Sequence, residues 1–149
     1  MELKDKIPPH NLEAEQATLG AIMLDWSAID RVGSLLHSDS FYSHQNQVIY
    51  DAMLSLANAR NIHGDVLTII EELTRTGKLE EAGGASYISS LTDVVPTAAN
   101  VEHYVSIVKD NASRRSLIKL SSEVKAMSFD QPLFPTVHFT RCVRIVCCT

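Results

Sequence analysis

The sequence predicts an all-α protein without a substantial sheet, in which a small globular helical head precedes one long helix. Apolar residues recur at steps of three, four and seven through most of the first 130 residues, as they do on the buried face of a helix. Before residue 130, no stretch longer than about five residues alternates cleanly between apolar and polar, as a strand would. A chain of 149 residues is also long enough for one domain with a proper core.

The first expected helix begins near Asn11 and ends near Asp25. Pro8 and Pro9 cannot continue a helix upstream, Asn11 is a good N-cap, and acidic residues in the first turn suit the helix dipole. The expected core stripe comprises Leu12, Leu19, Ile22 and Met23, and the expected solvent face comprises Glu13, Glu15 and Thr18.

The middle of the head is predicted to hold three more helices. A short one follows Ser27 and stops at Gly33, and after the pair Phe41-Tyr42 in a polar loop, residues 44–60 form the central core helix. Asp65 is the expected N-cap of residues 66–76, which end at Gly77. The expected buried stripe of this last helix is Leu67, Ile70 and Leu73.

Glycines and a proline mark the end of the head. Residues 79–82 form about one turn that ends at Gly83-Gly84, and residues 85–95 form a helix with Tyr87, Ile88 and Leu91 on one face. Pro96 closes that helix, because the residue before a proline avoids helical angles. Thr97 or Asn100 then caps the longest expected helix, from Val101 to about Met127.

This long helix has apolar residues in both halves and a polar run, residues 109–116, between them. Such a pattern predicts that the helix leaves the head partway along and packs its outer half on a partner helix. The apolar residues of the first half are Val101, Tyr104, Val105 and Val108, and those of the second half are Leu117, Leu120, Val124 and Met127.

We therefore expect a head over residues 1–100, the long helix over residues 101–130, and a separate disordered tail over residues 131–149. The tail contains all three cysteines, two of the thirteen basic residues and none of the eighteen acidic ones. Three cysteines confined to one end do not resemble a disulfide framework. A frame change, a cloning scar or a truncated gene would each produce such a tail.

Motif searches predict no catalytic, cofactor-binding or metal site in this chain. The phosphate-binding string G-x-x-x-x-G-K-[ST] does not occur, and no two histidines stand four apart on an expected helix. The set His138, Cys142, Cys147 and Cys148 has zinc-type ligands, but its adjacent cysteines give poor tetrahedral geometry. The pairs Glu71-Glu72 and Glu80-Glu81 are expected on solvated helix faces.

Charge and hydropathy exclude two further classes of binding. Thirteen basic residues against eighteen acidic ones argue against gripping nucleic acid by bulk charge. The one basic concentration, around Arg114 and Arg115, is expected on a solvated helix face, and contact with single-stranded DNA or with an acidic partner is the alternative. No run of eighteen apolar residues occurs, and residues 1–7 are charged, so we expect a cytoplasmic protein without a membrane anchor.

Several separated blocks carry a resemblance to a known family. They are residues 8–25 (PPHNLEAEQATLGAIMLD), Phe41-Tyr42, residues 83–87 (GGASY), residues 95–101 (VPTAANV) and Ile107-Val108. In this order and spacing, over about residues 7–128, the chain resembles the N-terminal domain of bacterial replicative DNA helicases of the DnaB type.

The resemblance implies a helical head followed by a helical hairpin whose first arm is residues 101–130. In that family, hairpins pair two subunits, and three pairs form a collar on a hexameric ring that receives the C-terminal domain of primase. A helicase loader is a further partner of the family. ATP and magnesium belong to a separate C-terminal motor domain, before which this chain stops, and a different tail replaces the second hairpin helix.

Nine residues are candidates for the partner interface that the resemblance implies. Four apolar residues of the first hairpin helix would pack inward or against a second subunit, and Arg114 and Arg115 fall where the family is often basic. Tyr87, Ile118 and Val124 are candidates for the primase-facing surface. The first four are Val101, Tyr104, Val105 and Val108.

Three functions remain open from the sequence. The first is a non-catalytic collar domain that associates with other subunits and binds primase during DNA replication. The second is a helicase or ATPase, if the chain is part of a longer working protein. The third is an isolated helical fragment without a function of its own.

Overall fold

The computed structural model describes residues 7–59, 63–95 and 97–130, with side chains as far as residue 128. All regular structure in these residues is helical, which confirms the predicted all-α class. The chain divides into two compact units, Met1–Arg115 and Ser116–Thr149. The predicted tail, with His138 and the three cysteines, lies outside the described residues.

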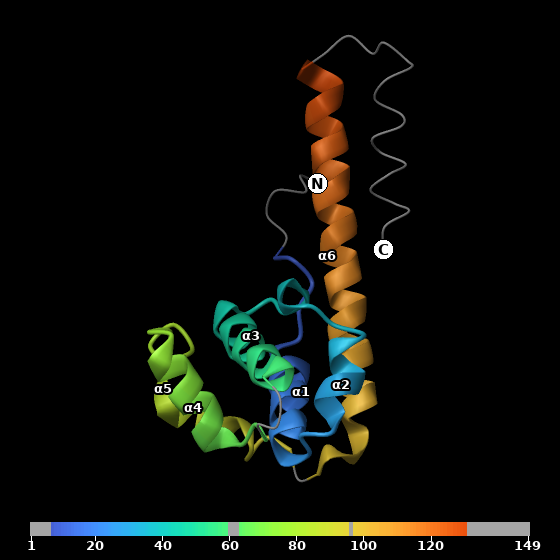
Figure 1. The fold of residues 1–149 in the computed structure, drawn as a ribbon. Helices are drawn as coiled ribbons and strands as arrows, with labels where there is room; N and C mark the ends of the chain where they lie inside the picture. Colours follow the sequence, from blue (N-terminus) through green and yellow to red (C-terminus); the bar gives the residue numbers. More distant parts are fainter. Residues whose placement is uncertain (1–6, 60–62, 96, 131–149) are drawn as a thin grey trace. The chain divides into compact units, whose positions relative to one another are not determined.

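Six α-helices and two short 3₁₀ helices follow one another along the described residues (Figure 1). They are α1 (Leu12–Leu24), α2 (Ala28–Gly33), η2 (Ser38–Ser40), α3 (His44–Asn58), α4 (Val66–Arg75), α5 (Gly84–Leu91), η3 (Ala98–Asn100) and α6 (Val101–Asp130).

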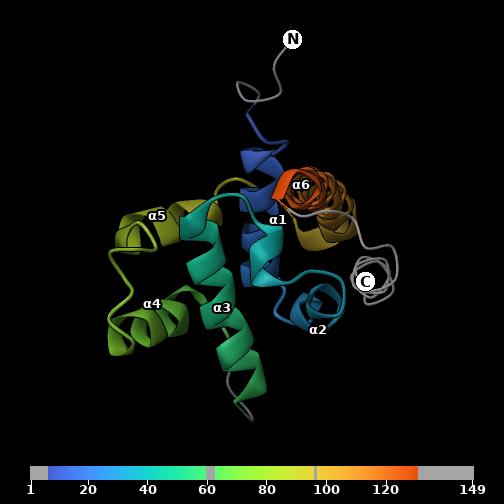
Figure 2. The same ribbon diagram turned by 90° about the horizontal axis from the view of Figure 1, so that it is seen from above.

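Helix α1 is the central element of the first unit, because it packs against α2, α3, α5 and η3 (Figure 2). As predicted, Asn11 caps it, and the Asn11 side chain accepts the backbone N–H of Ala14 at 3.0 Å. The predicted two-sided pattern is wrong in part, although Leu19, Ile22 and Met23 are buried as expected. Leu12 is 43% exposed, whereas Glu15 and Thr18 are buried. Small residues let neighbours approach α1 from every side, so almost no solvent face remains.

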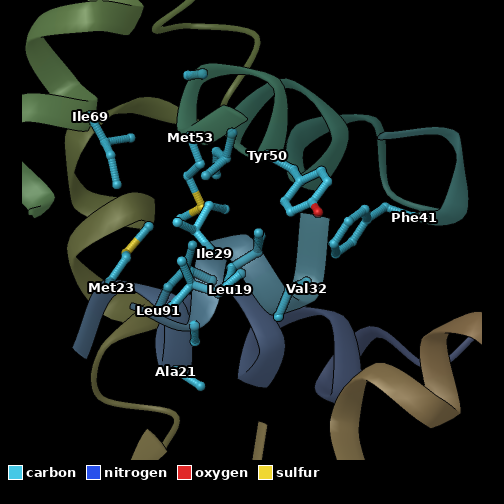
Figure 3. Close-up of a cluster of buried hydrophobic side chains, with 14 of the residues drawn as sticks. Leu19, Ala21, Met23, Ile29, Val32, Phe41, Tyr50, Met53, Ile69 and Leu91 are labelled. Atoms are coloured by element: carbon cyan, nitrogen blue, oxygen red, sulfur yellow. The ribbon is translucent and has the colours of Figure 1, made fainter. Parts of the chain in front are cut away.

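The core of the unit lies between α1, α2 and α3, with buried residues of α4 and α5 packed against them (Figure 3), and it extends to the start of α6. Phe41, which we expected in a polar loop, is buried, and its ring centroid lies 4.9 Å from that of Tyr50. The Tyr50 hydroxyl donates to the carbonyl oxygen of Leu36 at 3.2 Å. Burial raises the pKa of Tyr50 to about 12, so this side chain stays neutral over the physiological range.

Local signals at both ends of α4 act as predicted. The Asp65 side chain accepts the N–H of Thr68 at 2.8 Å, and Thr68 accepts the N–H of Asp65 in return. At the other end, Gly77 has a φ of 70°, a conformation that favours glycine. The predicted core stripe is wrong in part. Leu67 is 70% exposed, and Ile69 is buried beside Leu73 instead, because the helix turns a different face to α3 and α5.

The helix predicted over residues 85–95 is present, but its predicted end is wrong. Helix α5 begins at Gly84 rather than residue 85 and ends at Leu91, four residues before the expected end. Of the two predicted caps for the long helix, the Thr97 side chain accepts the N–H of Ala99 at 3.2 Å. It thereby caps η3, which leads directly into α6.

Gly20 allows α1 and α5 to cross at very short range. A Cβ atom at this position would lie 2.2 Å from the carbonyl oxygen of Leu91 and 3.1 Å from a methyl group of Val95. Because the nearest atom belongs to the backbone, the clash cannot be relieved by turning a side chain. Gly20 therefore sets the distance between the two helices.

We expect Gly20→Ala to lower the free energy of unfolding by about 1–3 kcal/mol, because it overpacks this crossing. Urea titration followed by the fluorescence of Trp26, the only tryptophan, measures the effect. Gly33→Ala is the matched control, since the nearest atom to its Cβ is a Leu54 methyl at 3.5 Å. Equal stability of the two variants would contradict the close-crossing explanation.

Candidate partner interface

The apolar candidates at the start of α6 pack inward. Val101, Val105 and Val108 are each 2% exposed and belong to the core, and Tyr104 is half-buried against it. Of the two alternatives from the sequence, inward packing is therefore the one that the structure shows. These side chains support the head and leave little surface for a second subunit.

Tyr87 projects from α5 into a buried polar cluster. Its hydroxyl donates to Asn46 Oδ1 at 2.8 Å and accepts from Gln16 Nε2 at 3.3 Å. The ring is half-buried against the core. The hydroxyl is thus committed to α1 and α3, and only part of the ring is accessible to a partner.

Glu15 is the centre of this cluster, and sequence reasoning placed it wrongly in solvent. Its side chain is only 1% exposed. One carboxylate oxygen accepts the N–H of Tyr42 at 2.7 Å, and the other accepts the N–H of Ser43 at 3.2 Å and Asn46 Nδ2 at 2.9 Å. The carboxylate also lies beside the N-terminus of α3, where the helix dipole favours negative charge.

A signal for this burial exists in the sequence. Thr18 lies one turn after Glu15, and Ala14 and Ala17 lie on other sides of the same helix. Small residues on several sides are typical of a helix packed on more than one side. A buried carboxylate is tolerable only when it is fully hydrogen-bonded. The donors come from residues 27 to 31 positions further along the chain, and no local pattern predicts them.

Arg115 is the last residue of the first unit and binds two distant segments of it. Its guanidinium donates to the carbonyl oxygen of Pro9 at 2.9 Å and to that of Ser40 at 2.5 Å. It also lies 5.8 Å from the ring centroid of Tyr42, on which His10 stacks at 4.3 Å. Arg115 therefore joins α6 to the segment before α1 and to the loop before α3.

The neighbouring Arg114 has a different environment. Its side chain is 62% exposed and pairs with Asp110, one turn earlier in α6, at 2.8 Å. Exposed pairs of this kind contribute little to stability. Arg114 is thus available to a partner, whereas Arg115 is engaged within the head.

Ile118 and Val124 lie in the second unit, on the outer part of α6, and both are exposed. Val124 shares a stripe with Leu117, Leu120 and Met127, at steps of three and four residues, the spacing of a coiled-coil seam. Ile118 is about 120° away from Val124 around the helix axis. The two candidates therefore do not share one narrow face.

No group of three or more potential metal ligands gathers within the described part of the chain. None of its helices is long and apolar enough to span a bilayer either.

The family assignment rests on the order of these helices and on their sequence. The family model for the DnaB-like helicase N-terminal domain matches residues 7–110. The chain belongs to this family. Replicative DNA helicase DnaB of Treponema pallidum is 47% identical over 129 residues, which are 87% of this chain and 29% of that relative. The chain thus spans less than a third of the DnaB relative that it matches.

Solved structures of DnaB N-terminal domains have the same fold. That of the DnaB helicase N-terminal domain from Mycobacterium tuberculosis has a TM-score of 0.83 at 36% identity, covering 93% of this chain and 96% of that one. The Helicobacter pylori domain, described with its interactions with primase, has a TM-score of 0.67 at 22% identity and covers 78% of this chain and 89% of that one. The second similarity extends to the fold alone.

We expect Glu15→Gln to lower the free energy of unfolding of this DnaB-family domain by roughly 2 kcal/mol or more, because hydrogen bonds to a buried charge are strong. The new amide would also place N–H groups against the donors of Tyr42, Ser43 or Asn46. Urea unfolding measures the loss. The control is Glu13→Gln, on the exposed side of the same turn, and a similar loss there would show that helix-end charge, rather than burial, is responsible.

Proposed function

We propose that this chain serves as the N-terminal collar domain of a hexameric, ATP-dependent replicative DNA helicase. Its role there is to associate subunits and to bind primase during DNA replication. The family membership supports the helicase assignment. The single observation that carries the interface role is the exposed apolar surface on the outer part of α6.

The outer part of α6 exposes far more apolar surface than the inner part. Leu117 is 65% exposed, Val124 42% and Met127 43%. An apolar stripe of this size on a polar helix is typical of an interaction site. Because its spacing fits a coiled-coil seam, we assign the stripe, including Val124, to association with a second copy, as in a dimer that repeats three times in a hexamer.

We assign primase binding to other candidates. Ile118 lies off the stripe and is 51% exposed, and Arg114 and the accessible part of the Tyr87 ring belong to the same proposal. The description of the H. pylori domain with primase supports it by analogy of fold. The C-terminal domain of primase is the proposed partner, and a helicase loader is a further one.

The remaining parts of this proposal concern cofactors, nucleic acid and location in the cell. ATP and magnesium act in a separate motor domain, and this domain contributes no strong binding of nucleic acid, in keeping with its excess of acidic residues. Because DNA replication in a bacterium takes place in the cytoplasm, we assign the chain to that compartment.

We expect Val124→Glu to weaken self-association by roughly tenfold or more, because it buries an unpaired charge in the seam. Sedimentation equilibrium over a range of chain concentrations measures the dissociation constant. Ser122→Glu adds the same charge on the other side of the helix and should leave the constant within about twofold. A monomeric unaltered chain, or equal effects of the two substitutions, would overturn the assignment of the stripe.

We expect Ile118→Glu to weaken binding of the cognate primase C-terminal domain by roughly tenfold. A few anchor residues carry most of the binding energy of an interface, and this substitution replaces an apolar one with a charge. Isothermal calorimetry with that domain measures it, and Ser116→Glu, about 160° away around the same helix, is the matched control. Sedimentation of the variant shows that self-association is retained. If the unaltered chain does not bind the primase domain, this part of the proposal is overturned.

A further inference from the structure

Tyr87 and Arg115 are the two ends of one polar network. Tyr87 binds Asn46 at 2.8 Å, Asn46 binds the Glu15 carboxylate at 2.9 Å, and that carboxylate binds the N–H of Tyr42 at 2.7 Å. Two residues earlier in the same loop, the carbonyl of Ser40 accepts from Arg115 at 2.5 Å. All of these residues belong to the first unit.

The loop of residues 40–43 is the shared element of this network. Arg115 holds its start, Glu15 holds two of its amides, and Gln47 Nε2 donates to the carbonyl of Phe41 at 2.7 Å. The Phe41 side chain is 1% exposed. Since both ends and the middle are fixed, the loop cannot shift at one contact without straining the others.

We propose that this network is a conformational coupling between α5 and α6, in which the contacts of Tyr87 and of Arg115 stabilise each other through the loop of residues 40–43. Release of the Arg115 guanidinium from Ser40 loosens the two amides that Glu15 binds, and with them the position of Asn46 and Tyr87. The reverse holds by linkage. A partner that binds at either helix then changes the stability of the contacts at the other helix.

The character of the two end contacts favours a switchable coupling. Both Tyr87 and Arg115 are half-buried, so a partner can reach them, whereas Glu15 and Asn46 between them are fully buried. Arg115 binds two neutral carbonyl oxygens, and a carboxylate or phosphate of a partner would bind a guanidinium more strongly. The proposal rests on these contacts and does not depend on the partner assignments made above.

A double-mutant cycle tests the coupling in the full 149-residue chain. Tyr87→Phe removes one hydroxyl, and Arg115→Lys keeps the charge but lacks the planar fork that spans two carbonyls. Amide hydrogen exchange of Tyr42 and Ser43, followed by NMR, is the readout. Each substitution should reduce protection of these amides by about threefold to tenfold, with the amide of Leu73 in α4 changing by less than about twofold.

The decisive quantity is the loss of amide protection in the double variant. Coupling predicts a loss of protection at least about threefold smaller than the product of the two single losses. The matched controls are Tyr104→Phe and Arg114→Lys, a half-buried tyrosine and an exposed arginine of α6, which should leave Tyr42 and Ser43 within about twofold. Two outcomes would overturn the proposal. In the first, the losses of protection in the two single variants simply multiply in the double variant. In the second, Leu73 loses as much protection as Tyr42 and Ser43 and the unfolding transition followed by Trp26 shifts with it.

The unaltered chain provides a second test that needs no substitution. In low concentrations of denaturant, the amides of Tyr42, Ile88 and Arg115 should exchange through one opening with a common denaturant dependence, as members of a cooperative unit do. Openings with separate dependences would contradict the coupling even if a variant failed to fold.

Discussion

Burial of the Glu15 carboxylate at the centre of the head is the constraint on which the rest of the structure depends. An ionised carboxylate in the interior is tolerated only with a full set of donors, and two backbone amides and the Asn46 side chain supply them. This requirement fixes the loop before α3, the start of α3 and the rotation of α1. At the other end of α1, Gly20 brings the α5 backbone close, so one helix determines the positions of two others.

The helices and their ends could be predicted from the sequence because local interactions determine them. Asn11 reaches Ala14, Asp65 reaches Thr68, and Gly77 adopts a positive φ just after its own helix. Each of these signals acts within about one turn. Family membership followed from separated blocks over most of the chain, and the match of residues 7–110 confirms it.

The faces of the helices were harder to predict, because a face depends on what packs against it. Leu12 and Leu67 have the spacing of core residues but are exposed, and Glu15 has the composition of a surface residue but is buried. The Arg115 hydrogen bonds join residues 75 and 106 positions apart. Periodicity fixes the spacing of a stripe, whereas only the tertiary arrangement fixes its direction and the partners of its polar groups.

The polar run in the middle of α6 lies where the apolar residues change from one side of the helix to another. At about 100° per residue, the apolar residues at positions 101–108 and those at positions 117–127 centre on directions about 130° apart, so the apolar pattern changes phase by roughly a third of a turn. The run between them contains the exposed Asp110–Arg114 pair and the engaged Arg115. A single helix therefore carries two apolar stripes with different phases. The first is buried within the chain, whereas Leu117, Val124 and Met127 of the second are exposed.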